Sequence, residues 1–320
     1  MYQTALQISL SPNDLELAKK LLPHQLKVWH GQVEKVYLVC DTQKSRGRFG
    51  DNWVSNYNKM ISLLEKTKDE YENIEVLFVD YSKITTIGNS FFGKKAPKKD
   101  FRGGPFFSYF YAISQIPSKY ILHIDSDIFF GGQSQNWFKE AVTILNQNDQ
   151  ILYVSPLPGP PREDGLLLNQ KYKPFFGAGD KAYAFNTMST RIFLIDKIRL
   201  YKYLPLPLKK VKGRKLLKAL ADRNPYYDLP ENLLTQHMVQ NNLIRVDFLG
   251  KEKGMWTLHP PYKTGTFYEN ILSLINRIDK CDIPDSQKGF YDIHDSMIDW
   301  SDARKSLKKN RWWRKLFKKA

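Results

Sequence analysis

The stretch Lys119-Tyr-Ile-Leu-His-Ile-Asp125-Ser-Asp127-Ile-Phe-Phe-Gly-Gly132 ends an apolar run in two carboxylates. The run from Tyr120 to Ile124 is short and apolar, which is typical of a strand buried on both faces. In an extended chain, residues i and i+2 point to the same side, so Asp125 and Asp127 can face one spot. That spot lies at the carboxyl end of a strand, where open α/β sheets bind their ligands.

Two carboxylates held side by side repel each other, and each is expected to raise the pKa of the other. A divalent cation removes this repulsion, and oxygen ligands suit Mg²⁺ or Mn²⁺, which keeps open positions for a phosphate. The alternative is a polar turn, because Asp and Ser are common turn residues. The strand that precedes the motif favours a site for a metal ion and a diphosphate.

The chain of 320 residues is long enough for one large α/β domain or two small ones. Its hydrophobic content of 42% and aromatic content of 14% predict a folded protein rather than a disordered one. No apolar run approaches the roughly 20 residues that span a bilayer, and we expect no signal peptide at the amino terminus. Two cysteines, Cys40 and Cys281, give no disulfide framework and favour a reducing, cytoplasmic compartment.

The formal net charge of +16 predicts anionic partners, which could be nucleotide phosphates, nucleic acid or a lipid surface. Charge alone does not choose among these three. Its distribution is more informative, because the last stretch of the chain holds a disproportionate share of the basic residues.

Apolar strands alternate with helices along the first half of the chain, which predicts βαβ units and a mainly parallel sheet. Residues 81–102 have no clear period and include Lys94, Lys95, Lys98 and Lys99, so we expect a mobile, basic surface loop there. Residues 192–200 fit a strand or a helix equally well, and residues 209–223 form a basic helix candidate. The other expected strands are 5–10, 35–40, 75–79, 151–154, 243–249 and 256–259, and the other expected helices are 11–28, 53–71, 103–115, 134–148, 228–240 and 268–278.

This order, with a central strand that ends in Asp125-Ser-Asp127, resembles the GT-A fold of nucleotide-sugar glycosyltransferases over roughly residues 4–265. The resemblance, which extends to the large inverting family of bacterial enzymes, implies a Rossmann-like α/β/α sandwich with a mainly parallel central sheet. It implies one catalytic domain over residues 1–299, with a nucleotide half at about 1–132 and an acceptor half at about 133–299. Residues 300–320 would follow as a basic, aromatic tail.

The resemblance also implies an activity, the transfer of a sugar from a nucleoside diphosphate sugar to a hydroxyl acceptor. A UDP-sugar is the favoured donor, and the acceptor would be a glycan or a lipid-linked molecule. In this family the D-x-D carboxylates bind Mn²⁺ or Mg²⁺ and, through the ion, the donor diphosphate. Those roles fall on Asp125 and Asp127, with Asp125 also counted among the donor contacts.

Further roles come from the same resemblance. Ser9, Ser11 and Asp41 stand where the first two strands usually meet the nucleoside, and Arg102 is an expected donor contact. Asp41 could equally be a plain strand-end cap. The loop residues Arg46 and Arg48 could reach the phosphates, although solvated loop charges are the more ordinary interpretation.

The acceptor half contributes the remaining candidates. Glu231 matches the acid that deprotonates the acceptor hydroxyl in many inverting members, and Asp228 is the reserve. The alternative for Glu231 is an ordinary acid in the first turn of a helix, where it complements the dipole. His259 matches a histidine that some members use as a further metal ligand, although a lone histidine often has only a structural role.

The tail differs in composition from the rest of the chain. On a helix, Trp312, Trp313, Leu316 and Phe317 fall within one arc of about 140°, with basic residues opposite. This pattern is typical of a helix that lies on anionic lipid, and it would fit a peripheral enzyme at the cytoplasmic face of a membrane. The alternatives are a tail that packs on the domain or one that binds single-stranded nucleic acid, a partner that we do not expect.

Two rival functions use the same residues differently. A phosphatase of the aspartyl-phosphate type also carries D-x-D after a buried strand, with the first Asp as the nucleophile. Such enzymes usually place the motif near the start of the chain. A non-catalytic protein that binds lipid or nucleic acid would explain the net charge but not the two carboxylates at a strand end. The sequence does not distinguish inversion from retention at the sugar.

Overall fold

The computed structural model describes residues 3–44 and 52–309. Within them the strands form one 11-stranded sheet in the order β3-β2-β1-β4-β9-β6-β10-β8-β7, and the antiparallel pair of β5 and β11 joins it through β6. The strands are β1 (Thr4–Leu10), β2 (Lys35–Cys40), β3 (Ile74–Phe78), β4 (Tyr120–Asp125), β5 (Phe129–Gly131), β6 (Ile151–Pro158), β7 (Lys173–Pro174), β8 (Ala182–Phe185), β9 (Ile192–Asp196), β10 (Ile244–Phe248) and β11 (Trp256–Leu258). The α-helices are α1 (Leu15–Trp29), α2 (Trp53–Glu70), α3 (Ile84–Phe92), α4 (Phe107–Gln115), α5 (Trp137–Gln147), α6 (Lys197–Lys202), α7 (Gly213–Ala221), α8 (Pro230–Gln240), α9 (Gly265–Asp279) and α10 (Ser301–Lys309).

The central strands run mainly in one direction, as the sequence predicts. Strands β3, β2, β1 and β4 are parallel. Strand β9 is antiparallel to both β4 and β6, so β6 runs in the same direction as β4, and β10 is parallel to β6. The reversed strand β9 therefore separates two parallel groups of strands.

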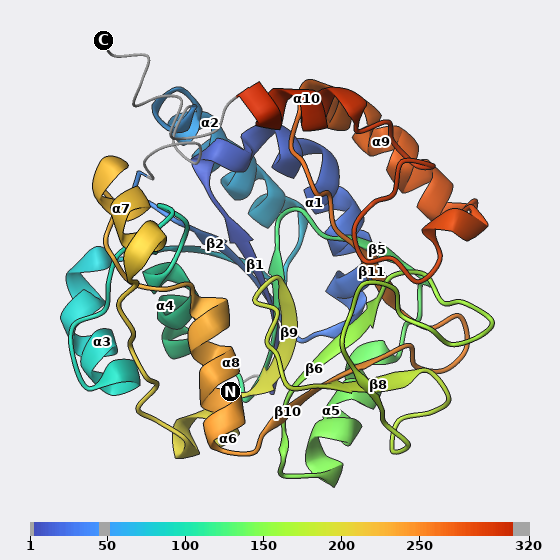
Figure 1. Cartoon of the computed structure of the whole chain (residues 1–320), viewed down its shortest axis with the longest axis horizontal. Coiled ribbons are helices and arrows are strands. Elements are labelled where there is room, and N and C mark those ends of the chain that lie inside the picture. The colour runs from blue at the N-terminus through green and yellow to red at the C-terminus, as the bar shows by residue number, and fades with distance from the viewer. Residues whose placement is uncertain (1–2, 45–51, 310–320) are drawn as a thin grey trace.

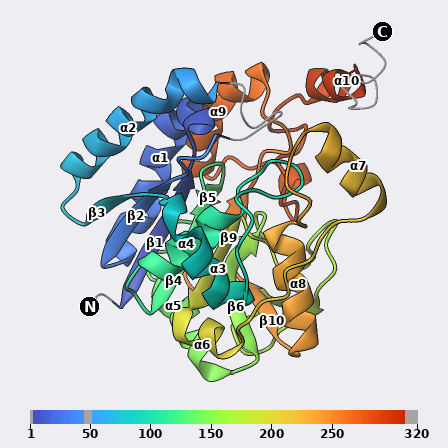
Figure 2. The same cartoon turned by 90° about the vertical axis from the view of Figure 1, so that its left-hand side faces the viewer.

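Alternation along the strands divides the core into layers on the two faces of the sheet. Leu6, Ile8 and Leu10 of β1 pack in one cluster with α1, α2 and α5. Ala5 of the same strand, with Tyr37 of β2, belongs to a second cluster that contains α3, α4 and α8. Successive strand residues point to opposite faces, so the sheet lies between two helical layers, which Figure 1 and Figure 2 show from two sides.

The expected surface loop at 81–102 is wrong for its first half. Residues 84–92 form helix α3, and Ile84, Ile87 and Phe91 are buried at a helical spacing. Lys99 is not a solvated loop charge either, because it is only 6% exposed. The segment was interpreted as a polar loop because of its lysines, although its apolar residues already have the period of a helix.

Other differences are smaller. Strand β6 continues to Pro158, four residues beyond the expected end. The ambiguous segment at 192–200 is both a strand and a helix, and it changes at Asp196, whose side chain accepts hydrogen bonds from the backbone N–H groups of Ile198 and Arg199. The basic helix is confirmed as α7.

Helix α10 occupies the start of the expected tail. Trp312, Trp313, Leu316 and Phe317, on which the lipid prediction rests, lie outside the described residues. Among the helices that the structure describes, none combines the length and the apolar character needed to cross a bilayer.

Candidate active site

Parallel pairing gathers the predicted residues at one edge of the sheet. Ser9 of β1 is in register with Asp125 of β4, and Leu10 is in register with Cys40 of β2, so Asp41 follows at the same level. A cleft of about 200 Å³ opens at these strand ends. Five predicted residues line it together: Ser9, Ser11, Asp41, Asp125 and Asp127.

Asp127 is the anionic centre of the cleft. It is 8% exposed, and its Oδ2 atom lies 2.9 Å from Lys263 Nζ and 3.8 Å from His259 Nε2. Burial acts to raise the pKa of Asp127, but Lys263, His259 and Arg191 outweigh it and lower the pKa to about 2. The expectation that the two neighbouring carboxylates raise this pKa is therefore wrong, because nearby cations dominate.

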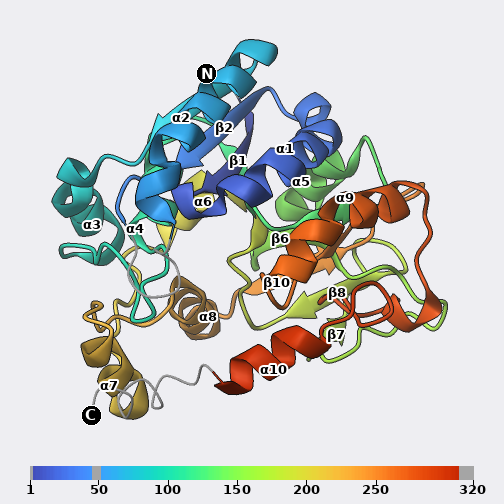
Figure 3. The same ribbon diagram turned by 90° about the horizontal axis from the view of Figure 1, so that it is seen from above.

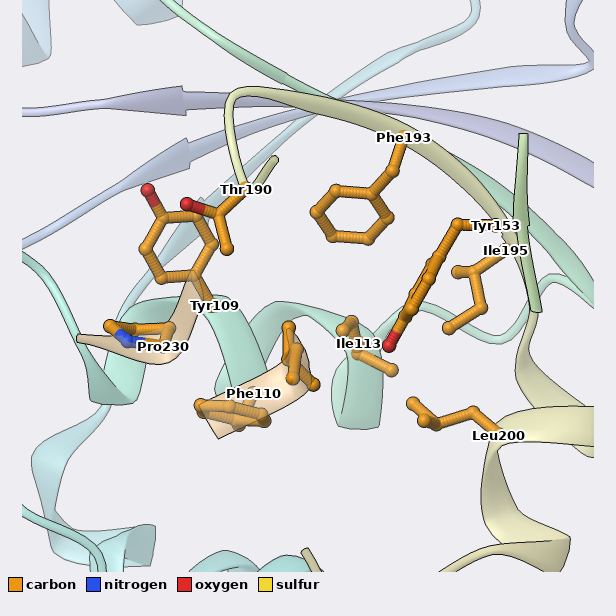
Figure 4. Close-up of a pocket in the computed structure, with 10 residues that line it drawn as sticks. Tyr109, Phe110, Ile113, Tyr153, Thr190, Phe193, Ile195, Leu200 and Pro230 are labelled. Atoms are coloured by element: carbon orange, nitrogen blue, oxygen red, sulfur yellow. The ribbon is translucent and has the colours of Figure 1, made fainter. Parts of the chain in front are cut away.

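Asp125 is held by the sheet and by α4. Its Oδ1 atom lies 3.3 Å from the hydroxyl of Tyr109 and 3.2 Å from His123 Nε2. Burial, and then the charge of Asp125, raise the pKa of Tyr109, so this hydroxyl stays protonated and donates to the carboxylate. Behind it, a small apolar cavity is lined by Tyr109, Thr190, Phe193 and Tyr153 among others (Figure 4).

The antiparallel pairing of β5 with β11 brings His259 to Asp127. Leu258 is in register with Phe129 in an antiparallel pair, so the next residue, His259, arrives beside the D-x-D segment. His259 Nδ1 lies 2.9 Å from Asp292 Oδ1, and the ring stacks on Tyr291 with centroids 5.7 Å apart. This partner orients the ring and leaves Nε2 directed toward Asp127.

Asp125, Asp127 and His259 suit a divalent cation in their donor chemistry. The Oδ1 atom of Asp127 is buried without a hydrogen-bond partner, and a carboxylate-oriented histidine is a common metal ligand. Within the described residues, however, no three acidic, histidine or cysteine side chains already form a metal cluster. Lys263 lies against Asp127 instead and supplies a positive charge there.

Lys263 also contacts a second acid, since its Nζ atom lies 3.7 Å from Asp14 Oδ1 at the start of α1. Partial burial lowers the pKa of Lys263, but Asp127 and Asp14 outweigh this effect and raise it, which keeps the amine charged. Lys263 and Asp14 both line the cleft. Neither residue was predicted as part of the site, and the only signal in the sequence was the position of Lys263 shortly after His259-Pro-Pro.

Arg191 is a further missed residue. It precedes β9, and its carbonyl accepts a hydrogen bond of 2.8 Å from the backbone N–H of Asp125. Burial lowers the pKa of its guanidinium, but Tyr291, Asp127 and Asp125 raise it further than burial lowers it. The reversed strand β9 thus brings a cation to the D-x-D motif, and local sequence patterns do not predict that strand's position.

Asp41 lines the cleft but is already engaged. Its Oδ1 atom accepts hydrogen bonds from the hydroxyl of Tyr81 at 2.7 Å and from the backbone N–H of Gln43 at 3.0 Å. Its Oδ2 atom lies 2.6 Å from the Nζ atom of the buried Lys99. The carboxylate therefore acts as a cap at the end of β2, and its role toward a base stays a prediction.

Glu231 stands in the first turn of α8, after Pro230. The side chain is solvent-exposed, while surrounding protein desolvates the carboxyl and raises its pKa against the opposing charges of Arg191, Arg245 and Arg102. The negative charge of Asp125 also contributes to raising the pKa of Glu231, so the two carboxyl groups interact electrostatically.

The two remaining candidates have structural partners. Asp228 Oδ1 accepts hydrogen bonds of 2.9 Å from the backbone N–H of Leu229 and from Asn232, so it holds the start of α8. Arg102 lies over the ring of Phe101 at 5.2 Å and is not among the residues that line the cleft. Arg46 and Arg48 lie outside the described residues.

Comparison with solved structures identifies the fold. GalNAc-T7, crystallised with UDP, GalNAc and Mn²⁺, is similar with a TM-score of 0.50 and 9% identity, and the match covers 97% of this chain and 54% of that one. S. aureus TarS gives a TM-score of 0.43 and 13% identity, over 85% of this chain and 39% of that one. The chain thus spans less than two thirds of either structure's length. No protein-family model matches it, and no curated protein matches it in sequence. The chain has the GT-A fold of nucleotide-sugar glycosyltransferases.

Proposed function

We propose that the protein is a glycosyltransferase that moves a sugar from a nucleoside diphosphate sugar to a hydroxyl acceptor. The observation that carries this proposal is the cleft at the ends of β1, β2 and β4, where Asp125 and Asp127 meet His259. The GT-A fold supports it, because ligands of open α/β sheets bind at the carboxyl ends of the strands.

A UDP-sugar is the donor that we propose, since the structure of GalNAc-T7 with which the chain shares its fold contains UDP. Ser9, Ser11 and Asp41 lie on the side of the cleft formed by β1 and β2, where they would contact the nucleoside. Lys263 and Arg191 are the cations beside the carboxylates, and they would face the diphosphate. Arg102 remains a proposed donor contact.

We further propose that Asp125, Asp127 and His259 hold Mn²⁺ or Mg²⁺. When bound, such an ion would offset the negative charge of the departing diphosphate. The unpartnered Oδ1 atom of Asp127 and the orientation of His259 by Asp292 support this assignment. Lys263 would then form ion pairs with the diphosphate or with the acids around the ion, because it already contacts Asp127 and Asp14.

Glu231 is the proposed general base, and Asp228 is the reserve. A base works best when its pKa lies near the working pH, and desolvation raises the pKa of Glu231 in that direction. Its solvent-exposed carboxylate is accessible to an acceptor hydroxyl, whereas Asp228 is bonded to its own helix. Glu231 would take the acceptor proton as the sugar is transferred.

The acceptor is proposed to be a glycan or a lipid-linked molecule at the cytoplasmic face of a membrane. The support is compositional, from the basic and aromatic residues at 300–320. Residues 1–299 would form the catalytic unit, with the nucleotide and acceptor halves meeting near residue 132.

A donor panel tests the proposal. The protein is incubated with UDP-, GDP-, CDP- and dTDP-sugars and Mn²⁺, and the released nucleoside diphosphate is measured. We expect turnover of one donor, lost in Asp125→Asn and Asp127→Asn and kept in Asp164→Asn, an exposed acid outside the cleft. Turnover that survives both cleft substitutions would contradict the proposal. A covalently phosphorylated Asp125 would instead support the phosphatase.

A further inference from the structure

Helix α7 has an apolar face that the rest of the domain covers only in part. At about 100° per residue, its leucines and alanines form one continuous arc. Ala219 is fully buried and Leu216 is partly buried, and both pack against Phe101 and Val211. Leu217 and Leu220, on the other edge of the same arc, are 59% and 56% exposed.

Basic side chains surround these exposed leucines. Between residues 209 and 223 the sequence has seven basic residues and one acid, Asp222. Most of the basic side chains are solvent-exposed. They are Lys209, Lys210, Lys212, Arg214, Lys215, Lys218 and Arg223. The segment therefore carries positive charge next to the exposed side chains of Leu217 and Leu220.

The position of α7 connects this surface to the candidate active site. Its preceding loop pairs with the segment before α8, since the N–H of Val211 donates to the carbonyl of Tyr226 at 2.8 Å. Lys215 Nζ lies 3.4 Å from Asp228, which holds the start of the helix that carries Glu231. Figure 2 and Figure 3 both place α7 at the margin of the molecule, on the same side as α10.

We propose that α7 docks on an anionic lipid bilayer, with Leu217 and Leu220 entering the interface and the basic residues meeting the headgroups. A short helix with a leucine strip beside Lys and Arg is suited to this position. A nucleic acid would use the cations but would leave the leucines without a partner, since binding of single strands relies on aromatic stacking. The inference does not depend on the transfer reaction or on the tail at 310–320.

Vesicle co-sedimentation of the full chain tests the apolar contact. The probes are vesicles of phosphatidylcholine alone and of phosphatidylcholine with phosphatidylglycerol. Leu217→Ser with Leu220→Ser should weaken binding to the anionic vesicles about tenfold, because two leucines no longer leave water. The matched control is Leu166→Ser with Leu272→Ser, two leucines that are 50% and 60% exposed elsewhere, and it should bind as the parent does.

A second arm tests the charges. Lys212→Gln with Arg214→Gln should reduce the preference for anionic vesicles, and added salt should reduce it further in the parent. Lys59→Gln with Lys66→Gln on α2 removes the same charge and should have little effect. Hydrogen exchange gives a local measurement, in which the amides of residues 213–221 should become protected when anionic vesicles are added.

Three results would overturn the proposal. Vesicle binding that is equal in the α7 leucine variant and its control, without protection of residues 213–221, would assign membrane contact elsewhere. Loss of oligonucleotide binding in the charge variant, with vesicle binding intact, would make the partner a nucleic acid. A sedimentation coefficient that falls in the leucine variant, with unchanged vesicle binding, would show that a second copy covers this face. None of these measurements uses a sugar donor, so they are independent of the proposed activity.

Discussion

At the scale of single residues, the cleft is organised by charge pairing around Asp127. Lys263, His259 and Arg191 act on this carboxylate, and together they hold its pKa at about 2 against the effect of burial. The carboxylate is therefore ionised at neutral pH without a bound metal ion. Lys263 is the largest of the three influences and the nearest, at 2.9 Å.

Replacement of Lys263 should change this balance. In Lys263→Met the pKa of Asp127 should rise, because burial then meets less opposing charge. A carbon NMR titration of the carboxyl groups measures the change, and Asp127 should take up its proton at a higher pH than in the parent. Lys19→Met, which removes an exposed partner of Glu16, is the control and should leave the curve of Asp127 in place.

Glu231 should govern the chemical step. We expect Glu231→Gln to lower kcat by about 10²- to 10⁴-fold, the range for loss of a general base, with little change in the affinity for the nucleotide. The parent's rate should fall as the pH drops through the pKa of Glu231, which desolvation of the carboxyl by the surrounding protein raises above its usual value. Glu269→Gln, an exposed acid on α9, should keep the rate and the pH profile of the parent. A variant of Glu231 that turns over at the parental rate would remove this residue from catalysis.

At the scale of elements, the pairing of β5 with β11 determines whether His259 reaches Asp127. Gly131 of β5 is in register with Trp256 of β11. Only a glycine fits at position 131, because a Cβ atom would lie 2.1 Å from the indole ring of Trp256. Local alternation could predict a strand at 256–259, but not its partner. The contact between His259 and the D-x-D segment was therefore expected from resemblance alone.

Gly131→Ala should shift Trp256 and displace β11 relative to β5. Overpacking of this kind costs about 1–3 kcal/mol of unfolding free energy, which a denaturant titration measures. Metal-dependent nucleotide binding should weaken at the same time, since His259 follows directly on β11. Gly31→Ala is the matched control, because its Cβ atom would meet nothing within 4 Å. If both variants have the same stability and nucleotide affinity, the pairing of β5 with β11 does not determine nucleotide binding at the cleft.

At the scale of the whole molecule, local patterns predicted the parallel half better than the acceptor half. The ends of β1, β2 and β4 were found because each strand is a mainly apolar segment with polar residues at or just after its end. The reversed strand β9 and the contact of Lys263 with Asp127 depend on pairing between distant segments, which periodicity does not report. Helix α3 is different, because its apolar spacing was present in the sequence and was obscured by the lysines that follow.

The structure shows where some of the basic residues behind the net charge of +16 lie. Lys263 lines the cleft, Arg191 acts on the charge of Asp127, and Lys99 is buried against Asp41. Others gather around the exposed leucines of α7. We therefore propose two separate sites for anions, a diphosphate at the cleft and a lipid surface at α7.

Calorimetric titration with nucleoside diphosphates tests the central claim most directly. UDP, GDP, CDP and dTDP are each added to the full chain with and without Mn²⁺, beside Asp127→Ala and the control Asp164→Ala. The account predicts that UDP binds, that Mn²⁺ strengthens its binding, and that Asp127→Ala loses the effect of the metal while Asp164→Ala keeps it. Absence of binding by every nucleotide, with and without Mn²⁺, would contradict it.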